Sequence, residues 1–207
     1  MTSDRVFILG VSGGSAAGKT TVARLLAEAL AKYDPAVIGV DMYYADQSAL
    51  TPDEEEKFDF DSPTALDFDL LAKDLDKLKS GEPVRIPSYD YATHSSIPNA
   101  TVVNPSRLII VEGILLFHSR PIQPLLDCKI FVDSDRDERL QRRITRDTRE
   151  RGRPKESALR RFYETVEPGF EKYTLPARSH AQFTLYWNRW DFKALEALSR
   201  RIEALIV

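Results

Sequence analysis

One stretch of the sequence decides the fold: Phe7-Ile-Leu-Gly-Val-Ser-Gly-Gly-Ser-Ala-Ala-Gly-Lys-Thr-Thr21. It leads from an apolar segment through small residues into a helical pattern, and it contains the G-x-x-x-x-G-K-[ST] motif of a phosphate-binding loop. Glycines let backbone N–H groups turn toward phosphate oxygens, and the following helix adds its N-terminal positive charge. The motif therefore predicts a nucleoside triphosphate site formed by Gly13, Gly14, Ser15, Ala16, Ala17, Gly18, Lys19, Thr20 and Thr21.

The length and composition are those of one globular domain. The chain has 207 residues, of which 43% are hydrophobic and 29% charged, so we expect a single domain over residues 1–207. The net charge of −3 argues against a dedicated nucleic-acid binder. No signal-peptide pattern opens the sequence and no apolar run reaches membrane-spanning length, so we expect a cytoplasmic protein without a membrane partner.

Apolar runs alternate with helical patterns along the chain. Continuous apolar runs predict buried parallel strands at 6–11, 36–40, 108–113 and 128–132, and a further strand at 182–186. Helical spacing predicts helices at 20–33, 156–173 and 191–206, and another that has Pro63 near its first turn, Asp61 or Ser62 as its cap, and Gly81 at its end. This alternation predicts an α/β fold, a parallel sheet of the P-loop NTPase type flanked by helices.

Acidic residues follow two of the predicted strands. Asp41 follows the second strand, with Tyr44 close behind it, and Glu112 ends the third. Open α/β sheets bind ligands beyond the carboxyl ends of their strands, so these residues are candidates for the site. Glu112 has the place of a Walker-B carboxylate, and together with the Thr20 hydroxyl it could bind Mg²⁺ or its waters.

Residues 84–104 predict a β-hairpin inserted into the α/β unit. Short strands at 84–86 and 101–103 enclose a polar, aromatic stretch, which we interpret as a substrate flap. Tyr89, Tyr91 and His94 could line one wall of a pocket there. From spacing alone, His94 could equally be an ordinary surface residue.

An arginine-rich segment follows the fourth strand. Residues 133–153 contain eight arginines and no lysine. Exclusive use of arginine favours planar, multi-donor recognition of phosphate, although some of these side chains could simply be solvated. Arg151-Gly-Arg153 marks a break at which the helix could bend over a nucleotide, so we expect a lid over 143–160. A flap and a lid would exclude water, which indicates a kinase rather than a generic ATPase.

Several motifs together resemble the uridine–cytidine kinase family. They are Gly-Gly-Ser-Ala-Ala-Gly-Lys-Thr-Thr, Asp-x-Tyr-Tyr, Phe-Asp-Ser-Pro, Ile-Pro-x-Tyr-Asp-Tyr-x-x-His, Val-Glu-Gly-Ile-Leu and Arg-Arg-x-x-Arg-Asp-x-x-Glu-Arg-Gly-Arg, in family order from about residue 6 to 180. The resemblance implies transfer of the γ-phosphoryl group of ATP or GTP to the 5′-hydroxyl of uridine or cytidine, with Mg²⁺. It also implies a homo-oligomer, since relatives are commonly tetramers.

The resemblance assigns a role to each matching residue. Asp41 would be the general base, and Asp61 with Arg143 would bind the ribose hydroxyls. The pyrimidine edge would be bound by Tyr89 and His94. The remaining roles are ring packing by Tyr91, a wall of the acceptor pocket formed by Tyr44, phosphate or acceptor contacts from Arg146, Arg151 and Arg153, catalysis by Lys19, and Mg²⁺ binding by Thr20 and Glu112.

Other features depart from the family or leave alternatives open. Ser96 and Arg161 differ from the usual residues near the base, and residues 186–191 lack the family's usual sequence after the last strand. Asn188-Arg-Trp-Asp191 resembles the guanine-reading element of GTPases, which could favour GTP as donor, but no Asp-x-x-Gly follows Glu112. A related kinase with another acceptor (phosphoribulokinase- or pantothenate kinase-like), a GTPase-type switch and a non-catalytic nucleotide-binding module stay open as alternatives.

Overall fold

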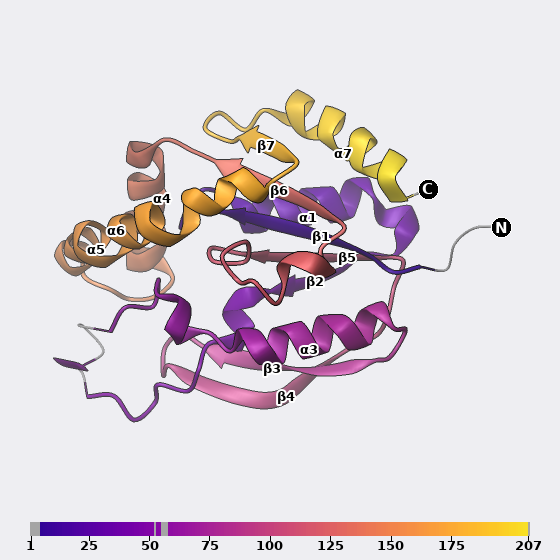
Figure 1. The fold of residues 1–207 in the computed structure, drawn as a ribbon. Coiled ribbons are helices and arrows are strands. Elements are labelled where there is room, and N and C mark those ends of the chain that lie inside the picture. Colours follow the sequence, from indigo (N-terminus) through magenta and orange to yellow (C-terminus); the bar gives the residue numbers. More distant parts are fainter. Residues whose placement is uncertain (1–4, 52, 55–57, 207) are drawn as a thin grey trace.

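The protein folds around a five-stranded parallel sheet with the strand order β2-β5-β1-β6-β7 (Figure 1). The structure is a computed structural model that describes residues 5–51, 53–54 and 58–206. All neighbouring strands of this sheet pair in parallel. The predicted α/β architecture is confirmed, with these strands: β1(Phe7–Gly13), β2(Ala36–Gly39), β5(Leu108–Gly113), β6(Cys128–Asp133) and β7(Phe183–Tyr186).

Helices cover both faces of the sheet, which explains why its strands are continuously apolar. Ile8 of β1 is fully buried in the core on one face, whereas Leu9 and Val11 are fully buried in the core on the other. The first core contains residues of α3(Phe68–Lys79) and of the segment that follows β5. The second contains residues of α1(Lys19–Ala29) and α7(Phe192–Ile206). None of the helices in the described part of the chain combines the length and apolar character needed to cross a membrane.

The helix predicted near Pro63 begins later than expected. Pro63–Ala65 forms a separate 3₁₀ turn, which Ser62 caps by accepting a hydrogen bond from the Thr64 amide. α3 itself begins at Phe68, and its cap is Asp67, whose carboxylate accepts a 2.8 Å hydrogen bond from the Leu70 amide. Of the two caps that we expected, Ser62 caps the 3₁₀ turn and neither caps α3, so the Asp61 carboxylate is left for other contacts.

The predicted hairpin is present, but its strands are longer than expected. β3(Val84–Asp90) and β4(Ser95–Val103) form a two-stranded antiparallel sheet apart from the main one (Figure 1). Main-chain pairing continues through Tyr89–Ser96 to Asp90–Ser95, so most of the polar stretch lies within the strands. Only residues 91–94 form the turn. Val84, Ile86 and Tyr89 of β3 pack on the core that contains α3.

The arginine-rich segment forms α4(Arg136–Arg149), and a bend leads from it into α5(Lys155–Arg161). The chain then stays helical through η5(Phe162–Val166), α6(Glu167–Gly169) and η6(Phe170–Thr174), of which η5 and η6 are π-helical. The remaining short 3₁₀ turns are η1(Ala31–Tyr33), η2(Val40–Tyr43), η3(Pro63–Ala65), η4(Gln123–Leu125) and η7(Pro176–His180).

A buried ion pair ties α4 to α6. The Arg139 guanidinium donates hydrogen bonds of 2.8 and 3.0 Å to the two carboxylate oxygens of Glu167, and it lies 4.0 Å from the centre of the Phe170 ring. A Cβ at Gly14 would come within 2.9 Å of the Arg139 side chain. The pair therefore fixes α4 against the phosphate loop.

Removing the charge of Glu167 should destabilise the fold. In Glu167→Gln the buried Arg139 would lose its charged partner, so we expect the free energy of unfolding to fall by about 3–5 kcal/mol in urea titrations. The matched control is Glu196→Gln, which breaks an exposed pair with Arg200 and should cost at most about 1 kcal/mol. Equal losses in the two variants would contradict this account.

Candidate active site

The phosphate loop connects β1 to α1, and two of its glycines cannot be replaced without strain. Gly13 has φ 153°, and a Cβ there would lie 2.1 Å from the carbonyl oxygen of Val132. Gly18 has φ 99°, and its Cβ would lie 2.6 Å from the indole of Trp187. These close approaches, from β6 and from the segment after β7, hold the loop in its tight turn.

Lys19 and Thr20 lie at the start of α1, beside the end of β5. The Lys19 ammonium is buried and donates a 2.9 Å hydrogen bond to the carbonyl of Gly14. Burial lowers the pKa of Lys19, while the charges of Glu112 and Asp41 oppose that shift. The group is thus a buried cation that faces into the loop, as binding of phosphate oxygens requires.

Thr20 and Glu112 present adjacent oxygen atoms. The Thr20 hydroxyl donates a 2.8 Å hydrogen bond to the Glu112 carboxylate. Burial raises the pKa of Glu112, and the nearby Lys19 charge and the Thr20 hydrogen bond partly offset this rise. A hydroxyl and a carboxylate beside a phosphate loop are the oxygen ligands that suit Mg²⁺, so these residues fit a magnesium site.

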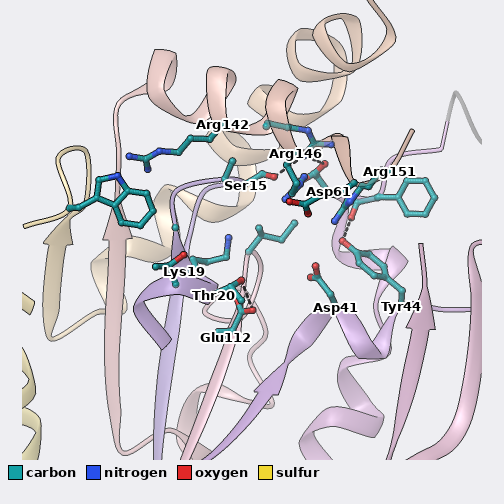
Figure 2. Close-up of a pocket in the computed structure, with 18 residues that line it drawn as sticks. Ser15, Lys19, Thr20, Asp41, Tyr44, Asp61, Glu112, Arg142, Arg146 and Arg151 are labelled. Atoms are coloured by element: carbon teal, nitrogen blue, oxygen red, sulfur yellow. Dashed lines mark hydrogen bonds and ion pairs between the residues drawn. The ribbon is translucent and has the colours of Figure 1, made fainter. Parts of the chain in front are cut away.

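A cavity of about 350 Å³ opens above the loop, and we call it the loop cavity. Figure 2 shows the carboxylates of Asp41 and Asp61 directed into the same hollow as the ammonium of Lys19. Asp41 is half-buried in η2, the turn that follows β2. The predicted site residues that line the loop cavity are Ser15, Ala16, Gly18, Lys19, Thr20, Thr21, Asp41, Tyr44, Asp61, Glu112, Arg143, Arg146 and Arg151.

A second cavity of about 540 Å³ adjoins the first at the tip of the hairpin, and we call it the hairpin cavity. Tyr89, Tyr91, His94 and Arg153 line it. The Tyr89 hydroxyl and His94 Nδ1 are 3.1 Å apart, and the His94 ring stacks on Phe60 at a centroid distance of 4.8 Å. The residues shared by both cavities are Tyr44, Phe60, Arg143 and Arg151.

The buried carboxylate of Asp147 forms ion pairs with three of the arginines that lie above the phosphate loop. Its oxygens lie 3.2 Å from Arg143, 2.8 Å from Arg146 and 3.9 Å from Arg151. Burial by itself raises the pKa of Asp147, but the three arginine charges outweigh burial and leave that pKa below its ordinary value. Arg143 in turn donates a 2.7 Å hydrogen bond to the Ser15 hydroxyl and lies 3.9 Å from Asp61.

Comparisons with known proteins identify the family. The model of the Phosphoribulokinase / Uridine kinase family matches residues 8–187. The chain belongs to this family.

Relatives and solved structures agree with this assignment. The chain is 37% identical over 199 residues to a uridine kinase of Staphylococcus epidermidis, covering 96% of each chain. A protein described as a fructose transport system kinase, from Silicibacter sp. TM1040, superposes with a TM-score of 0.72 at 25% identity, covering 87% of this chain and 90% of the other. A possible uridine kinase of Bacillus stearothermophilus superposes with a TM-score of 0.60 at 19% identity, covering 89% and 91%. The predicted resemblance to uridine kinases is confirmed, and this phosphoribulokinase/uridine kinase family member is an enzyme rather than a GTPase-type switch.

Three of the expectations for this family member can be compared with contacts in the structure. Arg153, which we also expected at the donor phosphates, lines only the hairpin cavity. The hydroxyl of Tyr91, which we expected only to pack on a base, donates a 2.8 Å hydrogen bond to Asp41. In residues 188–191, Asn188 accepts hydrogen bonds from Ser134 and from the amide of residue 135, and Asp191 accepts one from the Ala194 amide at the start of α7, while their guanine-reading role stays a prediction.

Sequence reasoning missed several residues of the site. Asp147 had a detectable signal, since it lies four residues after Arg143 and four before Arg151, the spacing of side chains on one helix face. The others line the loop cavity because distant segments meet there, and no local pattern marks them: Phe60, Ile114, Arg142, Glu150 and Trp190.

Replacing Asp147 should loosen the arginine cluster of this kinase. In Asp147→Asn three arginines lose their common carboxylate, so we expect kcat/KM to fall at least about tenfold and the free energy of unfolding to fall by about 3–5 kcal/mol. Asp137→Asn, on an exposed position of α4, is the control and should change neither.

The pH dependence of this loss follows from the lowered pKa of Asp147. A carboxyl with a lowered pKa contributes stability that is complete above its unfolded value of about 3.9 and is lost only as the pH falls through its lower folded value. The stability difference between the parent and Asp147→Asn should therefore stay constant from about pH 8 to pH 5 in urea titrations. A difference that shrinks between about pH 8 and 6 would contradict the assignment.

Proposed function

We propose that the protein is a uridine–cytidine kinase, which transfers the γ-phosphoryl group of ATP or GTP to the 5′-hydroxyl of uridine or cytidine. The observation that carries this proposal is the position of Asp41, between the phosphate loop on one side and an aromatic cavity on the other. Relatives named uridine kinase that match 96% of the chain support the choice of acceptor.

The hairpin cavity offers the groups that a pyrimidine nucleoside requires. Tyr89 and His94 can donate or accept hydrogen bonds, and such groups suit both the uracil carbonyl and the cytosine amino group. Asp61 and Arg143 line the loop cavity beside Asp41, and this carboxylate and guanidinium could bind the ribose hydroxyls. A nucleoside in this orientation would present its 5′-hydroxyl to Asp41.

The transfer itself requires one proton acceptor and several positive charges. Asp41 accepts the proton of the 5′-hydroxyl as the hydroxyl oxygen bonds to the γ-phosphorus, the bond from phosphorus to the β-phosphate oxygen breaks, and the nucleoside diphosphate leaves. Lys19, Arg146 and Arg151 stabilise the charge on the transferred group. Thr20 and Glu112 would hold Mg²⁺, which supplies further positive charge beside the β- and γ-phosphates.

The hairpin over 84–104 and the region 143–160 act in this proposal as flap and lid of a single domain. They meet where the Arg151 guanidinium lies 4.2 Å from the centre of the Tyr91 ring. Their closure over the two cavities would exclude water, which otherwise competes with the acceptor for the γ-phosphoryl group.

A panel of acceptors tests the proposed function. Coupled ADP-release assays should show turnover with uridine and cytidine and none above background with ribulose 5-phosphate or pantothenate. For 2′-deoxycytidine we expect kcat/KM to fall at least about tenfold, because a buried polar group left unpaired costs about 1–3 kcal/mol. Turnover with ribulose 5-phosphate or pantothenate alone would overturn the acceptor assignment.

Replacement of Asp41 tests the proposed mechanism. Asp41→Asn retains the shape of the side chain but cannot take the proton, so kcat should fall by about 10²–10⁴-fold while calorimetric binding of uridine is retained. The matched control is Asp46→Asn, an exposed carboxylate outside both cavities that should keep parental turnover. A near-parental kcat in Asp41→Asn would place the base elsewhere.

A further inference from the structure

The hydroxyl of Tyr91 is hydrogen-bonded to Asp41, the carboxylate that the proposed phosphoryl transfer uses as its base. It donates a 2.8 Å hydrogen bond to Oδ2 of Asp41. Asp41 lines the loop cavity and Tyr91 lines the hairpin cavity, so this bond spans the junction between the two. An acceptor whose ring lies in the hairpin cavity, and whose alcohol is to bond to Oδ2 of Asp41, must displace the phenol from that oxygen.

The surroundings of Tyr91 keep its hydroxyl a donor to Asp41. Burial and the adjacent negative charge of Asp41 raise the pKa of Tyr91 well above its ordinary value, so the phenol stays protonated. The ring is held between the Arg151 guanidinium, 4.2 Å from its centre, and the Tyr89 ring, whose centroid is 5.4 Å away at 83°. A neutral donor on a carboxylate makes a strong hydrogen bond.

The segment that carries Tyr91 can move without unpairing the hairpin. Tyr91 is the first residue of the turn 91–94, directly after β3, and the last pairs of the ladder are Tyr89–Ser96 and Asp90–Ser95. The turn backbone is held by two hydrogen bonds that do not involve the Tyr91 side chain: the Ala92 amide donates to the Asp90 carboxylate, and the Gln47 amide donates to the carbonyl of His94. A rotation of the Tyr91 side chain therefore leaves the strands paired.

We propose that the Tyr91 hydroxyl caps Asp41 until the acceptor alcohol replaces it, and that this cap suppresses hydrolysis of the bound triphosphate by water. The inference rests on the proposed role of Asp41 as the base. In the suppressed side reaction a water oxygen bonds to the γ-phosphorus, the bond to the β-phosphate oxygen breaks, ADP leaves with its electron pair, and the water's proton passes to Asp41. With the phenol in place, Oδ2 already accepts a hydrogen bond from the phenol hydroxyl, which makes it a weaker base toward water.

Removal of one oxygen atom tests the cap. In Tyr91→Phe, ADP release from Mg-ATP without any acceptor should rise at least about tenfold, because a hydrogen bond to a charged group is lost while the ring contacts stay. The KM for uridine should not rise, since the acceptor no longer competes with the phenol. The matched control is Tyr163→Phe, a half-exposed tyrosine outside both cavities, which should behave as the parent.

A double variant shows whether the extra hydrolysis uses Asp41. Tyr91→Phe combined with Asp41→Asn should return acceptor-free ADP release to the parental rate or below. Three results would overturn the proposal: unchanged hydrolysis in Tyr91→Phe, a raised KM for uridine without faster hydrolysis, or hydrolysis in the double variant as fast as in the single one. A Tyr91→Phe protein that does not fold would assign the bond to stability and overturn it as well.

The acceptor-free assay separates this inference from the proposed function. If the true acceptor is another alcohol, the acceptor panel fails with uridine and cytidine, yet hydrolysis in Tyr91→Phe still reports on the cap. If Asp41 is not the base, Asp41→Asn alone keeps its kcat.

Discussion

The site depends on keeping positively charged side chains buried, and it does so by placing a carboxylate beside each of them. Lys19 is buried at the start of α1, and burial alone disfavours its ammonium form. Glu112 and Asp41 offset that cost from the ends of neighbouring strands, and Asp147 pairs with three arginines of α4 and the bend that follows it. The site can hold a phosphate-binding charge in a partly dry hollow because each cation already has an anionic neighbour.

Tight packing beneath the loop provides the rigidity that this electrostatic arrangement needs. Trp187 is fully buried against Gly18, and the Arg142 guanidinium donates hydrogen bonds of 3.1 and 2.9 Å to the carbonyls of Trp187 and Asn188. The segment after β7 thus packs against the loop and supports it. Its Asn188 and Asp191 side chains also accept hydrogen bonds within the fold, from Ser134 and from the Ala194 amide.

In the proposed reaction, the acceptor alcohol and water compete for the γ-phosphoryl group and for the base Asp41, and the fold controls which of them reaches that base. The base of a kinase must accept a proton from the acceptor hydroxyl but not from water, which is far more abundant. The hairpin and the region 143–160 meet at the Tyr91 ring, and the same residue reaches Asp41. Closure of the site and access to the base would then be linked through one side chain.

Local patterns in the sequence were sufficient to predict most of the helices and strands of this protein. The phosphate-loop motif, the apolar strand runs and the helical spacing each report on nearby residues, so the α/β fold, the strand positions and the family resemblance could be predicted. The hairpin strands were predicted too short because pairing between Tyr89 and Ser96 depends on main-chain groups, which side-chain type does not reveal. The start of α3 was misplaced because Ser62 and Asp67 are both good caps and only packing distinguishes them.

The sequence by itself determined where the phosphate loop lies, and the order in which the acids follow the strands. Only the tertiary structure decided which charges meet. Arg143 meets Ser15 and Asp61 because α4 packs beside the loop, and Tyr91 meets Asp41 because the hairpin folds back beside the end of β2, fifty residues earlier in the chain. Hydrogen bonds and ion pairs act over a few ångströms, so contacts between distant segments follow from the fold and cannot be derived from spacing along the chain.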